Sequence, residues 1–107
     1  METTIRVDRA VTTLVNIFTV EPGSQPKVLA LLREGIETIF SKMPGWISSN
    51  VLESRDGSQV IVYSQWQDAR DIYAFREDAR MSPYFQRFGA LAKHESAICD
   101  VSCSLHA

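Results

Sequence analysis

The chain has 107 residues, of which 45% are hydrophobic and 22% are charged. This length suits one domain and leaves no room for separate cofactor and substrate domains, and the composition argues against disordered, collagen-like and strongly charged proteins. Because the net charge is −2 and the basic residues are scattered, nothing in the sequence predicts a nucleic-acid partner.

Residues 1–10 are mostly polar and are expected to form a flexible arm, followed by a single domain at residues 11–107. The arm carries no hydrophobic signal segment, and no apolar run in the chain approaches the roughly 20 residues that span a membrane. We therefore expect a cytoplasmic protein without a membrane partner.

A strand is predicted at residues 11–20, where β-branched residues are frequent. Alternate side chains of a strand share one face, and here that face carries Leu14, Asn16, Phe18 and Val20. Three of these four side chains are apolar, so this face is predicted to lie against the core.

A helix is predicted to be capped by Ser24 or Gln25 and to end near Met43. Pro26 suits the first turn, and apolar residues then recur at spacings of three and four, as they do in an amphipathic helix. Pro44 and Gly45 follow this stretch and are expected to stop the helix.

Two further strands are predicted at residues 46–54 and 60–66, paired as a hairpin around an Asp56-Gly57 turn. Asp68 is expected to cap a second helix, and Ser82-Pro83 is expected to interrupt it and start a new segment. The second helix is therefore predicted to be broken.

The last strand is predicted at residues 97–103 and contains Cys99 and Cys103. Their Cα atoms would lie about 13 Å apart at roughly 3.3 Å per residue, too far for a disulfide. With only His94 and His106 nearby, the spacing matches no common zinc site. We expect two reduced thiols and no metal.

The element order β-α-β-β-α-β predicts an α+β, ferredoxin-like fold, a four-stranded antiparallel sheet with the helices on one face. In the strand at residues 60–66, Val60 and Val62 point one way while Ile61 and Tyr63 point the other. Apolar groups on both faces predict a homodimer joined sheet to sheet, as in a dimeric α/β barrel.

Two polar groups in apolar surroundings are candidates for chemistry. A buried Asn16 amide without a partner would cost about 1 to 3 kcal/mol, so it either bonds nearby backbone or serves a ligand. Trp66, at the end of the third strand, either packs in the core or turns its indole N–H toward a cleft.

The interrupted helix is rich in aromatic residues, which either pack in the core or line the mouth of a pocket. Arg87 in the same segment is either solvated or directed inward to bind an anionic oxygen. His94, expected in a loop before the last strand, is given no catalytic role. The aromatic residues are Tyr73, Phe75, Tyr84, Phe85 and Phe88.

The runs TLVNIFTVEPG and PGWISSNVLESRDGSQVIVYSQWQDARDIYAF resemble the antibiotic biosynthesis monooxygenase domain, and the resemblance covers about residues 11–104. In that family PGF or PGW opens the second strand, and a tryptophan-containing run closes the third. The resemblance implies a ferredoxin-like fold and, usually, a dimer.

Similar proteins include cofactor-free oxygenases that turn anthrones into quinones, quinol monooxygenases and haem-degrading enzymes. The resemblance to the anthrone-oxidising members implies that Trp66, Tyr73 and Arg87 surround the substrate, although Val62 stands where some of them carry an asparagine. Asn16 matches a pocket asparagine of the haem-degrading members. Their iron-binding helix histidine has no counterpart at residues 68–92.

The function expected from the sequence is a cofactor-independent monooxygenase that uses O2 to oxidise a polycyclic aromatic substrate of the anthrone or quinol type to a quinone. A dimeric, non-catalytic domain that binds an aromatic metabolite is the alternative, and a haem-degrading enzyme is the third. No cofactor or metal is expected. The expected catalytic residues are Asn16, Trp66, Tyr73 and Arg87, and the expected substrate-binding residues are Leu14, Phe18, Val62, Phe75, Tyr84 and Phe88.

Overall fold

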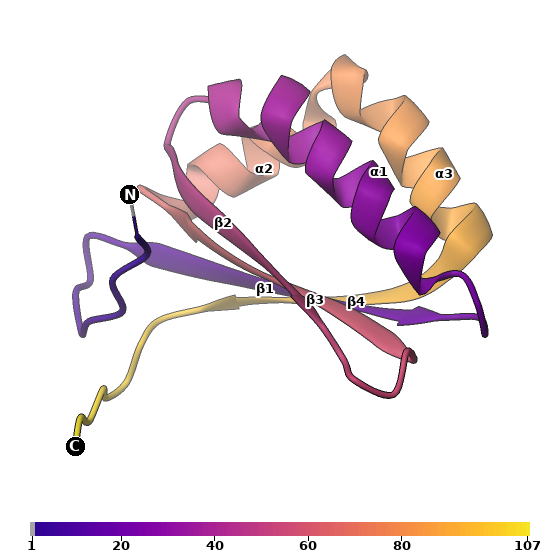
Figure 1. Cartoon of the computed structure of the whole chain (residues 1–107). Helices are drawn as coiled ribbons and strands as arrows, with labels where there is room; N and C mark the ends of the chain where they lie inside the picture. Colours follow the sequence, from indigo (N-terminus) through magenta and orange to yellow (C-terminus); the bar gives the residue numbers. More distant parts are fainter. Residues whose placement is uncertain (1) are drawn as a thin grey trace.

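The strands of the sheet follow the order β2-β3-β1-β4, and every pairing is antiparallel. A computed structural model describes residues 2–107. It places all the helices on one face of this sheet (Figure 1), which confirms the α+β, ferredoxin-like fold. The strands are β1 Thr12–Val20, β2 Trp46–Glu53, β3 Gln59–Trp66 and β4 Ala92–Cys99, and the helices are α1 Gln25–Thr38, α2 Ala69–Glu77 and α3 Ser82–Leu91, with 3-10 turns η1 Phe40–Lys42 and η2 Ala79–Met81.

Helix α1 ends at Thr38, five residues before the end that apolar spacing predicts. Ile39 leaves the helical conformation with φ −127° and ψ −58°, and the chain continues as the tighter turn η1. The Phe40 ring folds back against Gly35, where an added Cβ would lie 2.8 Å from it. Phe40 and Met43 are buried, so the apolar residues beyond Thr38 still contribute to the core although they are not part of the α-helix.

The Asp-Gly hairpin is confirmed. Gly57 adopts φ +79°, which suits glycine, and the Ser54 amide donates to the Gln59 carbonyl to close the turn. Hydrogen bonds from the Ser58 amide, the Ser58 hydroxyl and the Ser54 hydroxyl lower the pKa of Asp56 to about 2. The hairpin register is thereby set by local interactions.

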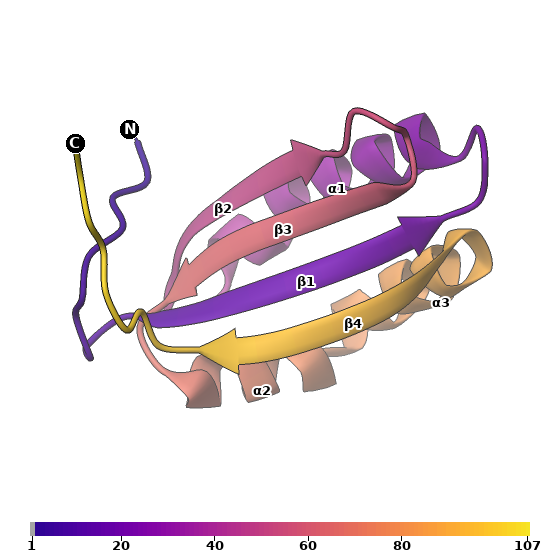
Figure 2. The same cartoon turned by 90° about the horizontal axis from the view of Figure 1, so that it is seen from below.

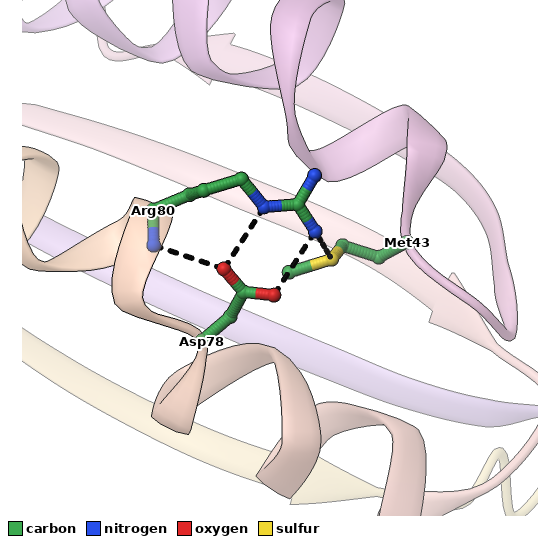
Figure 3. Close-up of polar contacts among 3 residues, drawn as sticks. All are labelled: Met43, Asp78 and Arg80. Atoms are coloured by element: carbon green, nitrogen blue, oxygen red, sulfur yellow. Dashed lines mark hydrogen bonds and ion pairs between the residues drawn. The ribbon is translucent and has the colours of Figure 1, made fainter.

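The second helix is broken, as predicted: α2 and η2 each begin at an aspartate cap, and α3 begins at Ser82 with Pro83 in its first turn. Asp68 accepts a hydrogen bond from the Arg70 amide at the start of α2, and Asp78 accepts one from the Arg80 amide at η2. The Arg80 guanidinium donates to both Asp78 oxygens and to the Met43 sulfur at 3.3 Å (Figure 3). Its side-chain hydrogen bonds lower the pKa of Asp78 to about 2. This contact ties the helix break to the segment that follows η1.

The prediction for the last strand is wrong in position. Strand β4 occupies Ala92–Cys99 and follows α3 without a loop, so His94 lies in the strand and Cys103 lies beyond it. Because β4 is an edge strand whose outer side chains include Lys93 and Glu95, it lacks the apolar alternation that marks a half-buried strand. Both cysteines are free.

The opposite face of the sheet has no helical layer, as the view from below shows (Figure 2). Direct strand pairs put Val15 beside Tyr63 and Ile17 beside Ile61 on this face. The N-terminal arm and the C-terminal tail meet at one end of the sheet, where the Ser104 hydroxyl donates to the Ile5 carbonyl. No helix within residues 2–107 is long and apolar enough to cross a membrane.

Two glycines with positive φ, one just before β2 and one in the hairpin turn, can be compared by mutation. Gly45 has φ +84° and an added Cβ would overlap the Asp71 carboxylate, whereas Gly57 has φ +79° and open space around it. Gly57→Ala should cost about 1 to 2 kcal/mol for the left-handed backbone alone. Gly45→Ala should cost clearly more in urea unfolding, because backbone strain and overlap add. Equal losses of stability in the two variants would show that the Asp71 side chain moves aside without cost.

Candidate active site

A cavity of about 440 Å³ is lined by residues of the helices and of the sheet face that they cover. This volume falls within the range of small-molecule sites. Most of its walls are apolar, and all four strands and the helices that cover the sheet contribute to them. The catalytic and substrate-binding residues expected from the sequence, here called the sequence-based site, include seven that line this cavity: Leu14, Asn16, Phe18, Val62, Trp66, Phe75 and Phe88.

Strand register explains why these side chains meet. Asn16 pairs with Val62 on β3 and with Ser96 on β4, and directly paired residues point to the same face of a sheet. The next pairs along β1 place Phe18 beside Val60 and His94. The central strand therefore brings an amide and an imidazole to the same part of an apolar wall.

The Asn16 side chain bonds another side chain. Its Oδ1 lies 2.8 Å from Nε2 of His94, and the His94 ring stacks on Phe18 at 4.8 Å between centroids. An amide oxygen only accepts hydrogen bonds, so Nε2 carries the proton and Nδ1 of a neutral ring keeps its lone pair. Among the described residues, the Asn16 amide nitrogen has no partner, so its N–H groups remain available to a ligand.

The electrostatics keep His94 neutral. His94 is exposed overall, but its ring packs against Phe18, and this partial burial lowers the pKa of its imidazole below the ordinary 6.5; the positive charge of Arg76 on α2 lowers it further. The Arg76 guanidinium donates to the Ser96 hydroxyl at 2.8 Å, which holds this charge beside β4. At neutral pH the imidazole therefore offers an unprotonated nitrogen.

Trp66 forms a second polar point in the cavity wall. The side chain is buried, its indole N–H donates to the Ser64 hydroxyl at 3.3 Å, and that hydroxyl donates to the Leu14 carbonyl. Phe75 packs against the indole at 5.3 Å between ring centroids. Along β3, Trp66 is four residues from the position that pairs with Asn16, about 13 Å at roughly 3.3 Å per residue. The two side chains thus start from separate points of the sheet, and the indole N–H is directed back along β3 toward Ser64.

Three residues of the sequence-based site lie away from the cavity lining. Tyr73 is 53% exposed on α2. The Arg87 guanidinium lies over the Tyr84 ring, 5.8 Å from its centroid. The Tyr84 hydroxyl donates to Glu34 at 3.3 Å. The structure therefore brings Asn16 and Trp66 to one cavity but does not bring Tyr73 and Arg87 to it.

Sequence reasoning missed four polar residues of the lining, namely Ser49, Ser64, Arg76 and His94. Ser64 could have been found, because it lies between Val62 and Trp66 on the same strand face. His94 could not, because its position depends on a strand that begins at Ala92. No group of three metal-ligating side chains gathers within residues 2–107.

Comparison with known proteins gives consistent results. The sequence model of the antibiotic biosynthesis monooxygenase family matches residues 12–91. Tetracenomycin-F1 monooxygenase from Streptomyces glaucescens is 35% identical over 95 residues, which are 89% of this chain and 85% of that protein.

The chain belongs to the antibiotic biosynthesis monooxygenase family.

Solved structures share the fold. SnoaB, a cofactor-independent oxygenase from Streptomyces nogalater, has a TM-score of 0.80 at 21% identity, with 90% of this chain and 97% of that chain covered. The ActVA-Orf6 monooxygenase of Streptomyces coelicolor, solved with nanaomycin D, has a TM-score of 0.81 at 22% identity, with 92% and 94% covered.

The family match ends at residue 91, so it does not include strand β4. Every other residue that lines the cavity falls inside the matched range, whereas His94 falls outside it. The imidazole beside Asn16 is therefore a feature of this chain that the family match does not describe.

The charge of Arg76 should be measurable at His94. Arg76→Gln removes the positive charge, so the pKa of His94 should rise toward 6.5 and remain below it, because burial is the larger cause of the shift. An NMR pH titration of the His94 ring would measure the change. Arg70→Gln, on the same helix but paired with Asp68, is the matched control and should leave the titration in place.

Proposed function

We propose that this family member is a cofactor-free monooxygenase that oxidises a polycyclic aromatic of the anthrone or quinol type with O2 to a quinone. The observation that supports this most directly is an apolar cavity of about 440 Å³ with an amide donor and an indole donor in its walls. The relatives named tetracenomycin-F1 monooxygenase and SnoaB support the same reaction class.

The chemistry suits a site with few polar groups. An anthrone that has lost a proton is an electron-rich anion, which can itself reduce O2. For an anthrone, one CH2 group and one O2 give one carbonyl and one water, so the substrate supplies all the electrons. The protein has to bind the rings, exclude water and stabilise the negative charge on the substrate oxygen.

Asn16 and Trp66 carry that last role in the proposal. In this proposal, the free N–H groups of the Asn16 amide donate hydrogen bonds to the enolate or phenolate oxygen. The Trp66 indole bonds Ser64 at 3.3 Å, slightly longer than is usual for such bonds, so a substrate oxygen can replace this partner. Because the two donors start from separate points of the cavity wall, they suit a fused-ring substrate with oxygen atoms at separate positions. Tyr73 and Arg87 have no part in this mechanism.

Loss of either donor should slow the reaction. Asn16→Ala or Trp66→Phe should lower kcat for anthrone or menadiol by about 10² to 10³, the usual effect of losing one oxyanion donor. Oxygen uptake measures the rate, and circular dichroism checks that each variant is folded. Asn50→Ala, on the opposite sheet face, is the control and should keep the wild-type rate. Both variants at the wild-type rate would contradict the mechanism.

The same assay separates the other candidate functions. A wild-type protein that binds an anthraquinone but consumes no oxygen with either substrate would favour a non-catalytic domain that binds an aromatic metabolite. A Soret band that forms on addition of haem would favour the haem-degrading class.

We further propose that the chain forms a homodimer through the sheet face opposite the helices. Val15, Ile17, Ile61 and Tyr63 form a continuous apolar patch at its centre, and Leu52 beside them is 50% exposed. A second copy of this face matches such a patch in shape and chemistry.

The dimer should be visible in sedimentation. The wild-type chain should sediment as a dimer at micromolar concentration, and Ile61→Lys should shift it to a monomer by placing a charge in the patch. A wild-type monomer at that concentration would contradict the interface.

A further inference from the structure

We propose that His94 is the base that removes a proton from the bound aromatic substrate, with Asn16 positioning its ring. This inference rests on the proposed function and adds a residue that lies outside the family match.

Two contacts fix the imidazole in the cavity wall. Its Nε2 bonds Oδ1 of Asn16 at 2.8 Å, and its plane lies within 19° of the Phe18 ring against which it stacks. The first contact selects the tautomer with the proton on Nε2, and so it leaves Nδ1 as the basic nitrogen. The second limits rotation of the ring. A general base needs this combination of a fixed orientation and a free lone pair.

The proton balance closes within one turnover. The substrate C–H or O–H bond breaks, an N–H bond forms at Nδ1, and the electron pair stays on the substrate. The substrate anion is oxidised as it bonds to O2, which is reduced to a bound peroxide. The imidazolium returns its proton to that peroxide, and loss of water then leaves the carbonyl.

The charges around His94 favour this cycle. The charged group that faces it from the helices is Arg76, while the β1 side chains beside it, Asn16 and Phe18, are neutral. On β4 itself, Lys93 and Glu95 point to the opposite face. Burial and Arg76 keep the pKa of His94 below 6.5, so the base is ready at neutral pH. The same positive charge stabilises the anion that forms when the proton leaves.

Oxygen uptake with anthrone between pH 5 and pH 9 tests the proposal. His94→Gln should lower kcat at neutral pH by about 10² to 10³, within the range for loss of a general base. His94→Ala should regain part of its rate when imidazole is added, an effect that a purely structural residue would not show. His106→Gln, in the C-terminal tail, is the matched control and should keep the wild-type rate. A His94→Gln rate within about threefold of wild type at every pH would overturn the proposal.

A pH profile tests the positioning role of Asn16. The wild-type rate should fall on the acid side as His94 takes up a proton, at a pH below 6.5. Asn16→Asp places a negative charge beside the ring and should move this acid limb to higher pH. An unmoved limb would overturn the link between the two side chains.

A binding measurement separates this inference from the proposed function. If the wild-type protein consumes no oxygen with anthrone, the proposed function fails, and His94 is tested with alizarin, a phenol whose absorbance changes when it ionises. Alizarin bound to the wild-type protein should ionise at lower pH than alizarin bound to His94→Gln. Equal midpoints would overturn the role of His94 as a proton acceptor.

Discussion

The pairing of β1 with both β3 and β4 is the constraint on which the site depends. Because side chains alternate along a strand, a single register decides that Asn16, Val62 and Ser96 share the helix-covered face. A slip of one residue in either pairing would turn Asn16 toward the opposite face or separate it from His94. Strong pairing on both sides of the central strand gives the amide and the imidazole their fixed relation, which neither helix packing nor local sequence provides.

A few polar groups in and beside an apolar wall give the cavity its chemical character: Trp66 and Ser64 are buried, Asn16 is half-buried, and His94, Arg76 and Ser96 are exposed. Each of these groups has a side-chain partner within the described structure. Asn16 bonds His94, Arg76 bonds Ser96 and Trp66 bonds Ser64. These hydrogen bonds hold the side chains in one orientation. A ligand therefore meets donors that need little reorganisation.

Local signals in the sequence predicted much of this structure. The Asp-Gly turn, the proline in the first turn of α1 and the Asp68 cap of α2 act over a few residues, and all of these features are present as expected. The alternation on β1 and β3 also identified five lining residues, including Asn16 and Trp66.

The remaining features depend on contacts between distant segments. Helix α1 stops early because Phe40 packs against Gly35, a contact that apolar spacing does not encode. Strand β4 begins at Ala92 because it pairs with β1, although its own sequence is polar. The resemblance to the family suggested Tyr73 and Arg87 as site residues. Tyr73, however, lies on the exposed side of α2, next to the buried Ile72, and Arg87 packs on Tyr84.

The direct junction between α3 and β4 has a consequence for how the cavity is entered. Phe88 and Gly89 in the last turns of α3 line the cavity, and His94 follows only five residues after Gly89, with no loop to absorb movement. A bulky ring system that enters by pushing this end of α3 outward pulls on the strand that carries the imidazole. Such an entry route would move His94 away from Asn16 while the substrate enters. The hydrogen bond between the two side chains would form again only when the end of α3 returns to its original position.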